Sequence, residues 1–420
     1  MEKNTINMEN SAGHSDRTAN HPCFSGSCKT ARMHIPVAPA CNISCNYCNR
    51  KFDCVNESRP GVTSEILTPE MAAEKFDVVR KSIDKLNVVG IAGPGDALAN
   101  FENTKKAIGL IRQIDPDITF CLSTNGLMLP HYAEEIIKLG ITHVTVTINT
   151  LDPVVGAKIY KEINYSGKKI CGEAGAEILI KNQLEGLKIL SAGGIVSKVN
   201  IVMIKGVNDQ HIEEVVRKAK ECGAFMTNIM PLIPAKGSAF ENMPLTNNKE
   251  LNDLRRKCET DLKQMYHCRQ CRADAIGTLG EDCSAAFRSK PEEEPHDSPG
   301  VDSGKPYTFA IATKTGKYVD MHFGKADEFH IYEYNDSKIS FIGKRAVNKY
   351  CTGSEECDDE DYKINSIIKT INGCDAVIVL RIGYRPSKEL QNKKIKVFQS
   401  CDSISQAIES TVKELALEAG

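Results

Sequence analysis

The sequence predicts an α/β protein: a partial (βα)6 barrel of the TIM type, followed by a small C-terminal α/β domain. Six apolar or β-branched runs alternate with amphipathic helical stretches between residues 32 and 266. Residues 288–306 are rich in Pro, Gly, Ser and acidic residues, which is typical of a linker. Beyond this stretch, about 115 residues show a new series of strand and helix patterns.

The candidate strands are continuous apolar runs rather than strictly alternating ones, which is typical of parallel strands buried on both faces. They cover residues 32–39, 87–93, 118–125, 143–149, 196–204 and 224–232. Because crossovers between parallel strands are right-handed, six such repeats predict a barrel that is open on one side. We expect the ligand-binding loops at the carboxyl ends of these strands.

The predicted helices lie between the strands. The first begins after Thr68, whose hydroxyl can cap it, with Pro69 in the first turn and Glu70 near the positive end of the helix dipole. The others are predicted at residues 102–114, 130–139, 175–192, 209–222 and 247–266.

We expect four segments along the chain. Residues 1–31 form a loosely structured N-terminal segment, which contains the cysteine-bearing piece "HPCFSGSC". Residues 32–287 form the barrel with a cysteine-containing extension, and residues 288–306 form the linker. In residues 307–420, strands are predicted at "YTFAIAT", "FHIYEY", "DAVIVLRI" and "IKVF", with a helix near 361–372 and a final helix.

Charge and hydropathy exclude several classes of partner. The formal net charge of −2 gives no reason to expect nucleic acid or an anionic membrane surface. No window approaches eighteen consecutive apolar residues, so no membrane span is expected. The polar first twenty residues lack the apolar core of a signal peptide, and we therefore expect a cytoplasmic protein.

Seventeen cysteines need an explanation other than disulfides, because the cytoplasm keeps thiols reduced. Four of them are expected to be structural, since they lie in or beside helix or strand patterns: Cys171, Cys222, Cys258 and Cys374. The others near the barrel form short clusters: Cys23 and Cys28; Cys41, Cys45, Cys48 and Cys54; and Cys268, Cys271 and Cys283. Such clusters are typical of metal binding.

Cys41, Cys45 and Cys48 have C-x3-C-x2-C spacing directly after the first strand. Three thiolates can hold three irons of a [4Fe–4S] cluster and leave the fourth iron open to a small molecule. The alternatives are a structural zinc site, or an electron-transfer cluster with Cys54 as its fourth ligand. The location after the first barrel strand favours the open cluster, and Tyr47 offers an aromatic surface for a stacked base.

This motif resembles the radical S-adenosylmethionine (SAM) superfamily. The resemblance implies that the open iron binds the amino and carboxylate groups of SAM, which the reduced cluster cleaves to a 5'-deoxyadenosyl radical. The glycines of "GPGD" permit close approach to the SAM amino group, polar residues contact the ribose and carboxylate, and apolar residues flank the adenine. The cofactor-binding residues so implied are Gly93, Pro94, Gly95, Asp96, Ser123, Thr124, Asn125, Asn149, Met230 and Ile233.

Further segments resemble the NifB family of nitrogenase cofactor biosynthesis proteins. They are "HPCFS", "ARMHIPVAPACNISCNYCNRKFDCVNESRPGVTS", "GPGDALA", "LSTNGL", "NIMPLIP" and "CRQCRADAIGTLGED". The resemblance implies a carbide synthase that fuses two [4Fe–4S] substrate clusters around a carbon from a SAM methyl group. Its product is the eight-iron precursor of the iron–molybdenum cofactor. The implied partners are a cluster donor of the NifU type and cofactor scaffolds or carriers of the NifEN and NifX types.

Substrate clusters that must merge and leave should have few protein ligands. We assign His21, Cys23 and Cys54 to one cluster, and Cys268 and Cys271 to the other. Cys121 is a candidate methyl acceptor or cluster contact, although it could equally be a buried strand cysteine. Glu57 is a candidate for proton handling or for contacting SAM. Five cations flank the cysteine segments and are expected to offset cluster charge: Arg50, Lys51, Arg59, Arg269 and Arg272.

The C-terminal stretch "FAIATKTGKYVDMHFGKADEFHIYEY" resembles the NifX-type cofactor-binding domain, which implies an RNase H-like fold. His322 is the residue expected to hold a finished cluster, with Cys351 or Cys357 as a partner. Two other functions remain open. The chain could be another radical SAM enzyme with auxiliary clusters, or an iron–sulfur carrier that binds clusters without turnover.

Overall fold

The computed structural model describes residues 18–49, 61–235, 237–287, 306–314, 316–319, 321–335, 338–347, 366–380, 382–400 and 403–417. The chain divides into two compact units, one ending at Arg288 and the other beginning at Ser289. Each unit is described separately below.

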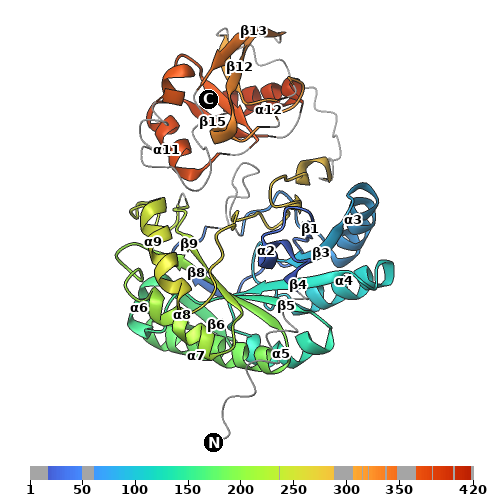
Figure 1. Cartoon of the computed structure of the whole chain (residues 1–420), viewed down its shortest axis with the longest axis vertical. Coiled ribbons are helices and arrows are strands. Elements are labelled where there is room, and N and C mark those ends of the chain that lie inside the picture. Colours follow the sequence, from blue (N-terminus) through green and yellow to red (C-terminus); the bar gives the residue numbers. More distant parts are fainter. Residues whose placement is uncertain are drawn as a thin grey trace, which may run out of the picture. The chain divides into compact units, whose positions relative to one another are not determined.

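The first unit contains a curved sheet with the strand order β10-β1-β3-β4-β5-β8-β9 in the described part of the chain (Figure 1). All neighbouring strands are parallel except the short edge strand β10, which runs antiparallel to β1. The strands are β1 (Ala31–His34), β3 (Leu86–Ile91), β4 (Thr119–Thr124), β5 (His143–Thr147), β8 (Val196–Met203), β9 (Met226–Pro231) and β10 (Ile276–Gly277). This arrangement confirms the predicted partial barrel.

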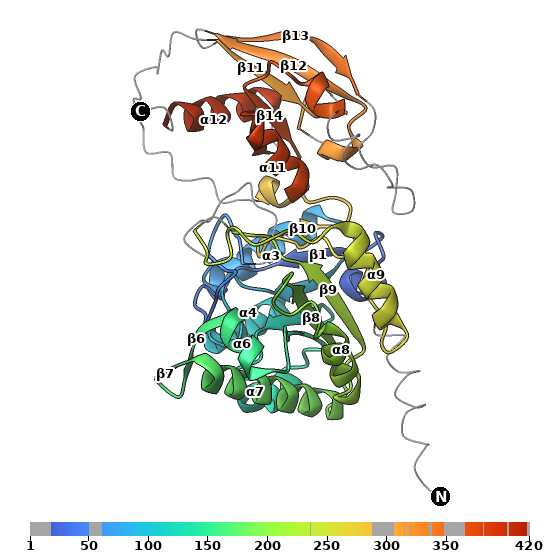
Figure 2. The same ribbon diagram turned by 90° about the vertical axis from the view of Figure 1, so that its left-hand side faces the viewer.

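Helices follow the strands along the chain and surround the sheet (Figure 2). They are α3 (Pro69–Ser82), α4 (Phe101–Ile114), α5 (Leu129–Lys138), α6 (Pro153–Ile159), α7 (Gly172–Ala192), α8 (Ile212–Glu221) and α9 (Asn248–Glu259). Helix α3 begins as predicted, since the Thr68 hydroxyl accepts a hydrogen bond from the Met71 N–H at 3.2 Å.

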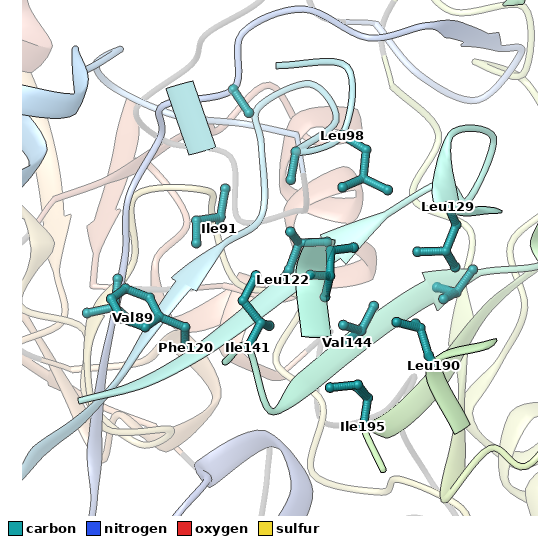
Figure 3. Packing of buried hydrophobic residues seen from close by; sticks show 14 of the residues in the cluster. Val89, Ile91, Leu98, Phe120, Leu122, Leu129, Ile141, Val144, Leu190 and Ile195 are labelled. Carbon is teal, nitrogen blue, oxygen red and sulfur yellow. The ribbon is translucent and has the colours of Figure 1, made fainter. Parts of the chain in front are cut away.

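The two faces of the barrel strands differ, which corrects the expectation of strands that are apolar on both faces. On β4, Phe120 and Leu122 pack into the hydrophobic core under the helices (Figure 3). Cys121 and Ser123 of the same strand line a cavity on the other face. Strands β5, β8 and β9 alternate in the same way. The inner face of the barrel is therefore a polar, ligand-sized space rather than a packed core.

A hairpin of β6 (Tyr160–Tyr165) and β7 (Lys168–Cys171) was not predicted. It forms a second small sheet with β2 (Ile43–Cys45), which belongs to the cysteine loop after β1. Helix α7 starts directly after β7, three residues earlier than predicted. The hairpin therefore fastens the cysteine loop to a segment more than a hundred residues later in the chain.

Helix α9 ends at Glu259, which corrects the prediction of a helix up to residue 266. The following residues run alongside β9 instead: Thr227 N–H donates to the Lys263 carbonyl at 2.9 Å, and Met265 N–H donates to the Thr227 carbonyl at 2.9 Å. This extended strip leads the chain back to the cavity, where Cys268 and Cys271 lie.

Part of the N-terminal segment is packed rather than loose. Residues 18–31 include the short helix α2 (Pro22–Ser25), and Phe24 is only 1% exposed. Phe24 forms a small core with Val196, Met226 and Met265. The segment "HPCF" is thus part of the first unit and brings its His and Cys to the inner face of the sheet.

The second unit contains a five-stranded sheet, counted over its described residues, with the order β13-β12-β11-β14-β15. Strand β12 is antiparallel to both neighbours and the other pairs are parallel. This 3-2-1-4-5 order with an antiparallel second strand is the RNase H-like topology that was predicted. The strands are β11 (Tyr307–Ile311), β12 (Glu328–Asn335), β13 (Lys338–Ala346), β14 (Ala376–Val379) and β15 (Lys396–Gln399).

Two hydrophobic cores lie in the second unit. Its described helices include η2 (Phe323–Lys325), α11 (Tyr384–Asn392) and α12 (Ile404–Leu417), and residues 366–370 are also helical. Strand β13 and helix α11 were not predicted. Among the described residues of both units, no helix is long and apolar enough to cross a membrane.

Candidate active site

A single cavity of about 750 Å³ on the inner face of the barrel collects most of the predicted site residues. Those that line it are His21, Cys23, Cys41, Cys45, Cys48, Pro94, Gly95, Asp96, Cys121, Ser123, Thr124, Asn125, Met230, Cys268 and Cys271. Gly93, Asn149 and Ile233 are not among the lining residues. Cys54, Glu57, Cys351 and Cys357 lie outside the described residues. His322 belongs to the second unit.

The loop with Cys41, Cys45 and Cys48 is held by backbone pairing. Cys45 is paired with Tyr160 of β6, and Asn46 N–H donates to the Ile159 carbonyl at 2.8 Å. Cys48 N–H donates to the Cys45 carbonyl at 3.0 Å, which closes the loop into a turn. The three thiols therefore face the cavity from a loop whose backbone is fixed on both sides of Cys45.

The GPGD segment supports this loop from the other side. Gly95 N–H donates to the Ala38 carbonyl at 2.7 Å, and Asp96 N–H donates to the Ala40 carbonyl at 2.8 Å. A Cβ atom on Gly95 would overlap the Ala40 carbonyl oxygen. Glycine is thus required here by close contact with the backbone before Cys41, a reason that the sequence interpretation did not include.

Asp96 organises the end of β4. Its buried carboxylate accepts hydrogen bonds from the Thr124 hydroxyl at 3.0 Å, from the Asn125 N–H at 2.6 Å and from the Leu98 N–H at 2.9 Å. Burial raises the pKa of Asp96, and these hydrogen bonds oppose that shift. Asn125 in turn donates from Nδ2 to Asn42 Oδ1 at 2.7 Å, which connects β4 to the cysteine loop.

Asn149 is fully buried behind the cavity. Its side chain accepts from the Val202 N–H at 2.8 Å and donates to the Tyr47 hydroxyl at 3.2 Å. Asn149 therefore positions Tyr47, whose ring lines the cavity. The sequence had led us to expect that Asn149 itself contacts the ribose or carboxylate of SAM. Burial, together with Cys45, raises the pKa of Tyr47 well above its usual value, so the phenol is neutral.

Three further thiols lie together in the same cavity. Cys268 and Cys271 both act electrostatically on Cys23, whose pKa is raised mainly by burial. Asn228 donates from Nδ2 to Cys268 Sγ at 3.3 Å, and Arg32 donates from Nη2 to Cys271 Sγ at 2.9 Å. Cys23 therefore lies close enough to Cys268 and Cys271 to be affected by their charge, and it also lies beside His21, with which the sequence interpretation grouped it.

His21 offers a buried nitrogen to the cavity. Its Nδ1 accepts a hydrogen bond from the Cys23 N–H at 3.3 Å, and its Nε2 has no partner among the described residues. Burial, His143 and Lys198 hold the pKa of His21 well below its usual value, so the ring is neutral. Because the N–H can only donate, the ring proton lies on Nε2 and must leave before that atom can bind iron.

Cys121 and His34 lie next to each other, with Gly90 leaving room for both: a Cβ on Gly90 would lie 2.8 Å from His34 Cδ2 and 3.1 Å from Cys121 Sγ. Burial raises the pKa of Cys121 to about 12, so the thiol is protonated at neutral pH. Burial also lowers the pKa of His34 to about 4, and its Nδ1 is bonded to the Arg272 carbonyl at 3.0 Å.

Sequence reasoning missed Lys198 and Asn228, which are buried and line the cavity, and His34, which is half-buried and lines it. It also missed the buried Arg32, which bonds to the cavity residue Cys271. Arg32, only 1% exposed, also donates from Nη1 to the carbonyls of Gly277 and Thr278, both at 2.7 Å. A charged residue inside an apolar strand run was the available signal, in "ARMHIPV" and in "VSKVNIV".

The expected flanking cations behave differently from one another. Arg269 lines the cavity. Arg272 is committed to Asp274, with 2.9 Å between Nε and Oδ1, and both side chains are buried. Although burial raises the pKa of Asp274, Arg272 and Ser64 hold it below its usual value. Arg272 is therefore not available to offset cluster charge, and Arg50, Lys51 and Arg59 lie outside the described residues.

The donor set fits iron–sulfur groups in two places. Three thiols project from one fixed loop, and a second set of three thiols lies with an unpartnered imidazole nitrogen in the same cavity. In the described ranges, no three His, Cys, Asp or Glu side chains are placed to hold a single metal ion.

Comparison with known proteins identifies relatives of this chain. The profile of the radical SAM superfamily matches residues 35–219, and that of the dinitrogenase iron-molybdenum cofactor family matches residues 305–414. The FeMo cofactor biosynthesis protein NifB of Herbaspirillum seropedicae is 44% identical over 420 residues, covering 91% of this chain and 79% of the relative. NifB of Azotobacter vinelandii is 40% identical over 451 residues, with coverages of 96% and 89%.

The chain belongs to the NifB family. It is a radical SAM enzyme of FeMo cofactor biosynthesis, and its superfamily implies a [4Fe–4S] cluster and SAM. The second unit is a NifX-like domain, as predicted. Among solved structures, SuiB of Streptococcus suis is similar over 61% of this chain and 53% of its own, with 14% identity and a TM-score of 0.42.

Proposed function

We propose that this NifB-family chain is a carbide synthase of the lyase or transferase type. It fuses two [4Fe–4S] substrate clusters and inserts a carbon from a SAM methyl group, giving the eight-iron precursor of the FeMo cofactor. One observation carries the proposal: the SAM-type cysteine loop and a separate group of thiols share one cavity. A radical SAM enzyme that binds only its SAM cluster does not need that second group.

The three-thiol loop is the proposed SAM site. Cys41, Cys45 and Cys48 would hold a [4Fe–4S] cluster, which would supply the electron for the reductive cleavage of SAM. Hydrogen bonds of Asp96 and Asn125 fix the position of this loop relative to the end of β4. The polar end of β4 faces the cavity, where its side chains can bond the ribose and carboxylate of SAM, while Tyr47 and Met230 provide surfaces for the adenine.

The second set of thiols is the proposed substrate site. Cys23, Cys268 and Cys271, with His21 and with Cys54 from outside the described residues, hold iron–sulfur clusters as substrates rather than as permanent cofactors. Few ligands per cluster leave the clusters free to merge and depart. A methyl group passes from SAM to a substrate-cluster sulfide, and hydrogen is then removed from it by the radical.

Cys121 lines the same cavity, near Cys23, and is proposed to contact a substrate cluster. Its neutral, buried thiol is a weak nucleophile, which favours this role over acceptance of the methyl group. Glu57, from outside the described residues, remains the proposed residue for proton handling or SAM contact. In the NifX-like unit, His322 is proposed to hold the product before transfer; its Nδ1 accepts from the Gly324 N–H at 3.1 Å.

Clusters are proposed to arrive from a NifU-type donor, and the product is proposed to pass to NifEN- or NifX-type proteins. The test is anaerobic reconstitution followed by an iron count and addition of SAM and reductant. A carbide synthase gives both 5'-deoxyadenosine and S-adenosylhomocysteine, since one SAM supplies the radical and another the methyl group. Deoxyadenosine alone indicates a different radical SAM enzyme, and neither product indicates a carrier. Iron for only one cluster per chain would contradict the proposal.

A further inference from the structure

Lys198 is a buried lysine on the inner face of β8. Its side chain is 6% exposed and lines the cavity from within a strand of the central sheet. Removing an ammonium group from water is costly unless an opposite charge compensates it. Lys198 is therefore expected to have an anionic partner.

The protein supplies no such partner among its described residues. No ion pair joins Lys198 to a described carboxylate. Its Nζ donates instead to the thioether sulfur of Met265 at 3.8 Å. Nζ also lies 5.0 Å from the ring centroid of Phe24. A weak sulfur acceptor and a cation–π contact offset only part of the desolvation cost.

The titratable groups around Lys198 are thiols and imidazoles. Its charge acts on His21 and Cys23 from α2 and its N-cap, on Cys121 from β4, and on His267 from the strip that follows α9. Imidazoles carry no negative charge, and thiols carry one only as thiolates, the form that binds iron.

We propose that Lys198 binds an iron–sulfur substrate cluster by compensating its charge. A substrate cluster bound through the thiolates of Cys23, Cys268 or Cys271 carries the negative charge of those ligands into the cavity beside Lys198. One-electron reduction makes it more negative. Lys198 supplies the opposite charge from the wall of the cavity. The sequence analysis had given this role to Arg272 and to the other cations that flank the cysteine segments. This inference rests on the proposed function, in that it assumes a substrate cluster at these thiols.

The test compares Lys198→Met, which keeps the length of the side chain, with Lys198→Arg, which keeps the charge. Lys263→Met is the matched control, because Lys263 also makes a cation–π contact, 5.2 Å from the Phe225 ring centroid, but is exposed and outside the cavity. Each full-length variant is reconstituted anaerobically, and its iron is counted. Paramagnetic resonance during a redox titration then gives the potential of each cluster.

The expected result is that K198M loses most of the iron held beyond the SAM cluster, and that any substrate cluster left is reduced at a more negative potential. K198R should retain the iron, and K263M should match the wild type. The SAM-cluster spectrum within the same chain reports correct folding, and Lys198→Gln replaces K198M if the latter does not fold. The inference is overturned if the uncharged variants load and titrate like the wild type, if K198R fails as K198M does, or if K263M shows the same loss.

Failure of the proposed function gives a different result. If the wild-type chain itself holds iron for the SAM cluster alone, there is no substrate cluster to bind, and the carbide synthase proposal fails together with the inference. If the wild type loads every cluster and K198M does so equally well, only the role of Lys198 is wrong.

Discussion

Gly95 packs directly against Ala40, so that the position of a Cβ atom on Gly95 is already filled by the Ala40 carbonyl oxygen. Ala40 immediately precedes Cys41, and Gly95 follows β3, the strand next to β1. The first cysteine of the loop is therefore positioned by the backbone of a neighbouring strand–helix repeat.

Gly95→Ala should move this backbone and displace Cys41. We expect a loss of stability of roughly 1–3 kcal/mol, as for other overpacked sites, and loss of the SAM cluster. Thermal unfolding and the cluster absorbance measure both effects. Gly109→Ala is the control, because nothing lies within 4 Å of a Cβ there. Gly109 is at an exposed position of helix α4, where alanine should stabilise the protein by about 0.5–1 kcal/mol. A cluster-loaded G95A protein would contradict the assigned contact.

Asn164→Pro should loosen the cysteine loop from the β6–β7 hairpin. The Asn164 N–H donates to the Asn42 carbonyl at 2.7 Å, and proline removes that donor. We expect weaker iron retention under a chelator and slower SAM cleavage. Asn164→Ala retains the N–H and should behave like the wild type. Equal iron retention in both variants would show that the hairpin does not hold the loop.

Arg32→Lys should destabilise the protein, although it conserves charge. A lysine cannot reach Cys271 and the carbonyls of Gly277 and Thr278 together, and each buried acceptor left unpaired costs about 1–3 kcal/mol. Denaturant unfolding should show this loss. Arg112→Lys, at a more exposed arginine that donates to the Gly140 carbonyl at 3.1 Å, should change stability by less than about 0.5 kcal/mol.

Stability should fall as the pH is lowered from about 6.5 towards 4, in part because of His34. Burial lowers the folded-state pKa of His34 from 6.5 to about 4, so in this window the unfolded chain binds more protons than the folded one. Once the pH lies below both pKa values of His34, this shift lowers the free energy of unfolding by about 3 kcal/mol. Denaturant midpoints at pH 7 and pH 5 measure it. His34→Gln should flatten the pH dependence, and an unchanged slope would exclude His34 as its source.

Cys121 should react with iodoacetamide far more slowly than Cys28 in chains without clusters. The Cys121 thiol is held in the cavity with its pKa raised to about 12, whereas Cys28 is exposed, and only the thiolate reacts. Peptide mass spectrometry after timed alkylation compares the two. Rapid modification of Cys121 at neutral pH would support its alternative role as a methyl acceptor.

The barrel could be predicted because its signals are local. The apolar runs, the Thr68 cap and the C-x3-C-x2-C spacing each depend on neighbouring residues, and the structure has them where they were expected. The polar inner face was not predicted, although polar and apolar residues alternate in "VTVT" and "KVNIV". The high apolar content of these runs was given more weight than this alternation. Reading β4 and β8 as two-faced strands would have identified Cys121 and Lys198 as cavity residues.

The rest depends on contacts between distant segments, which a single sequence does not reveal. The pairing of β2 with β6, the extended strip after α9 and the Arg32–Cys271 contact each join residues far apart in the chain. Asn149 was predicted to contact SAM because it ends a strand, but its bonds to Val202 and Tyr47 come from tertiary packing. The grouping of Cys23 with Cys268 and Cys271 has the same origin.

The pairing of the cysteine loop with β6 also has a consequence during translation. Cys41, Cys45 and Cys48 are synthesised long before the hairpin at Tyr160–Cys171 that holds their loop. Cys23 is synthesised still longer before Cys268 and Cys271, which lie near it in the fold. Iron delivered during translation would meet unconfined thiols. We therefore expect the proposed metal centres to form only after nearly the whole first unit has been synthesised.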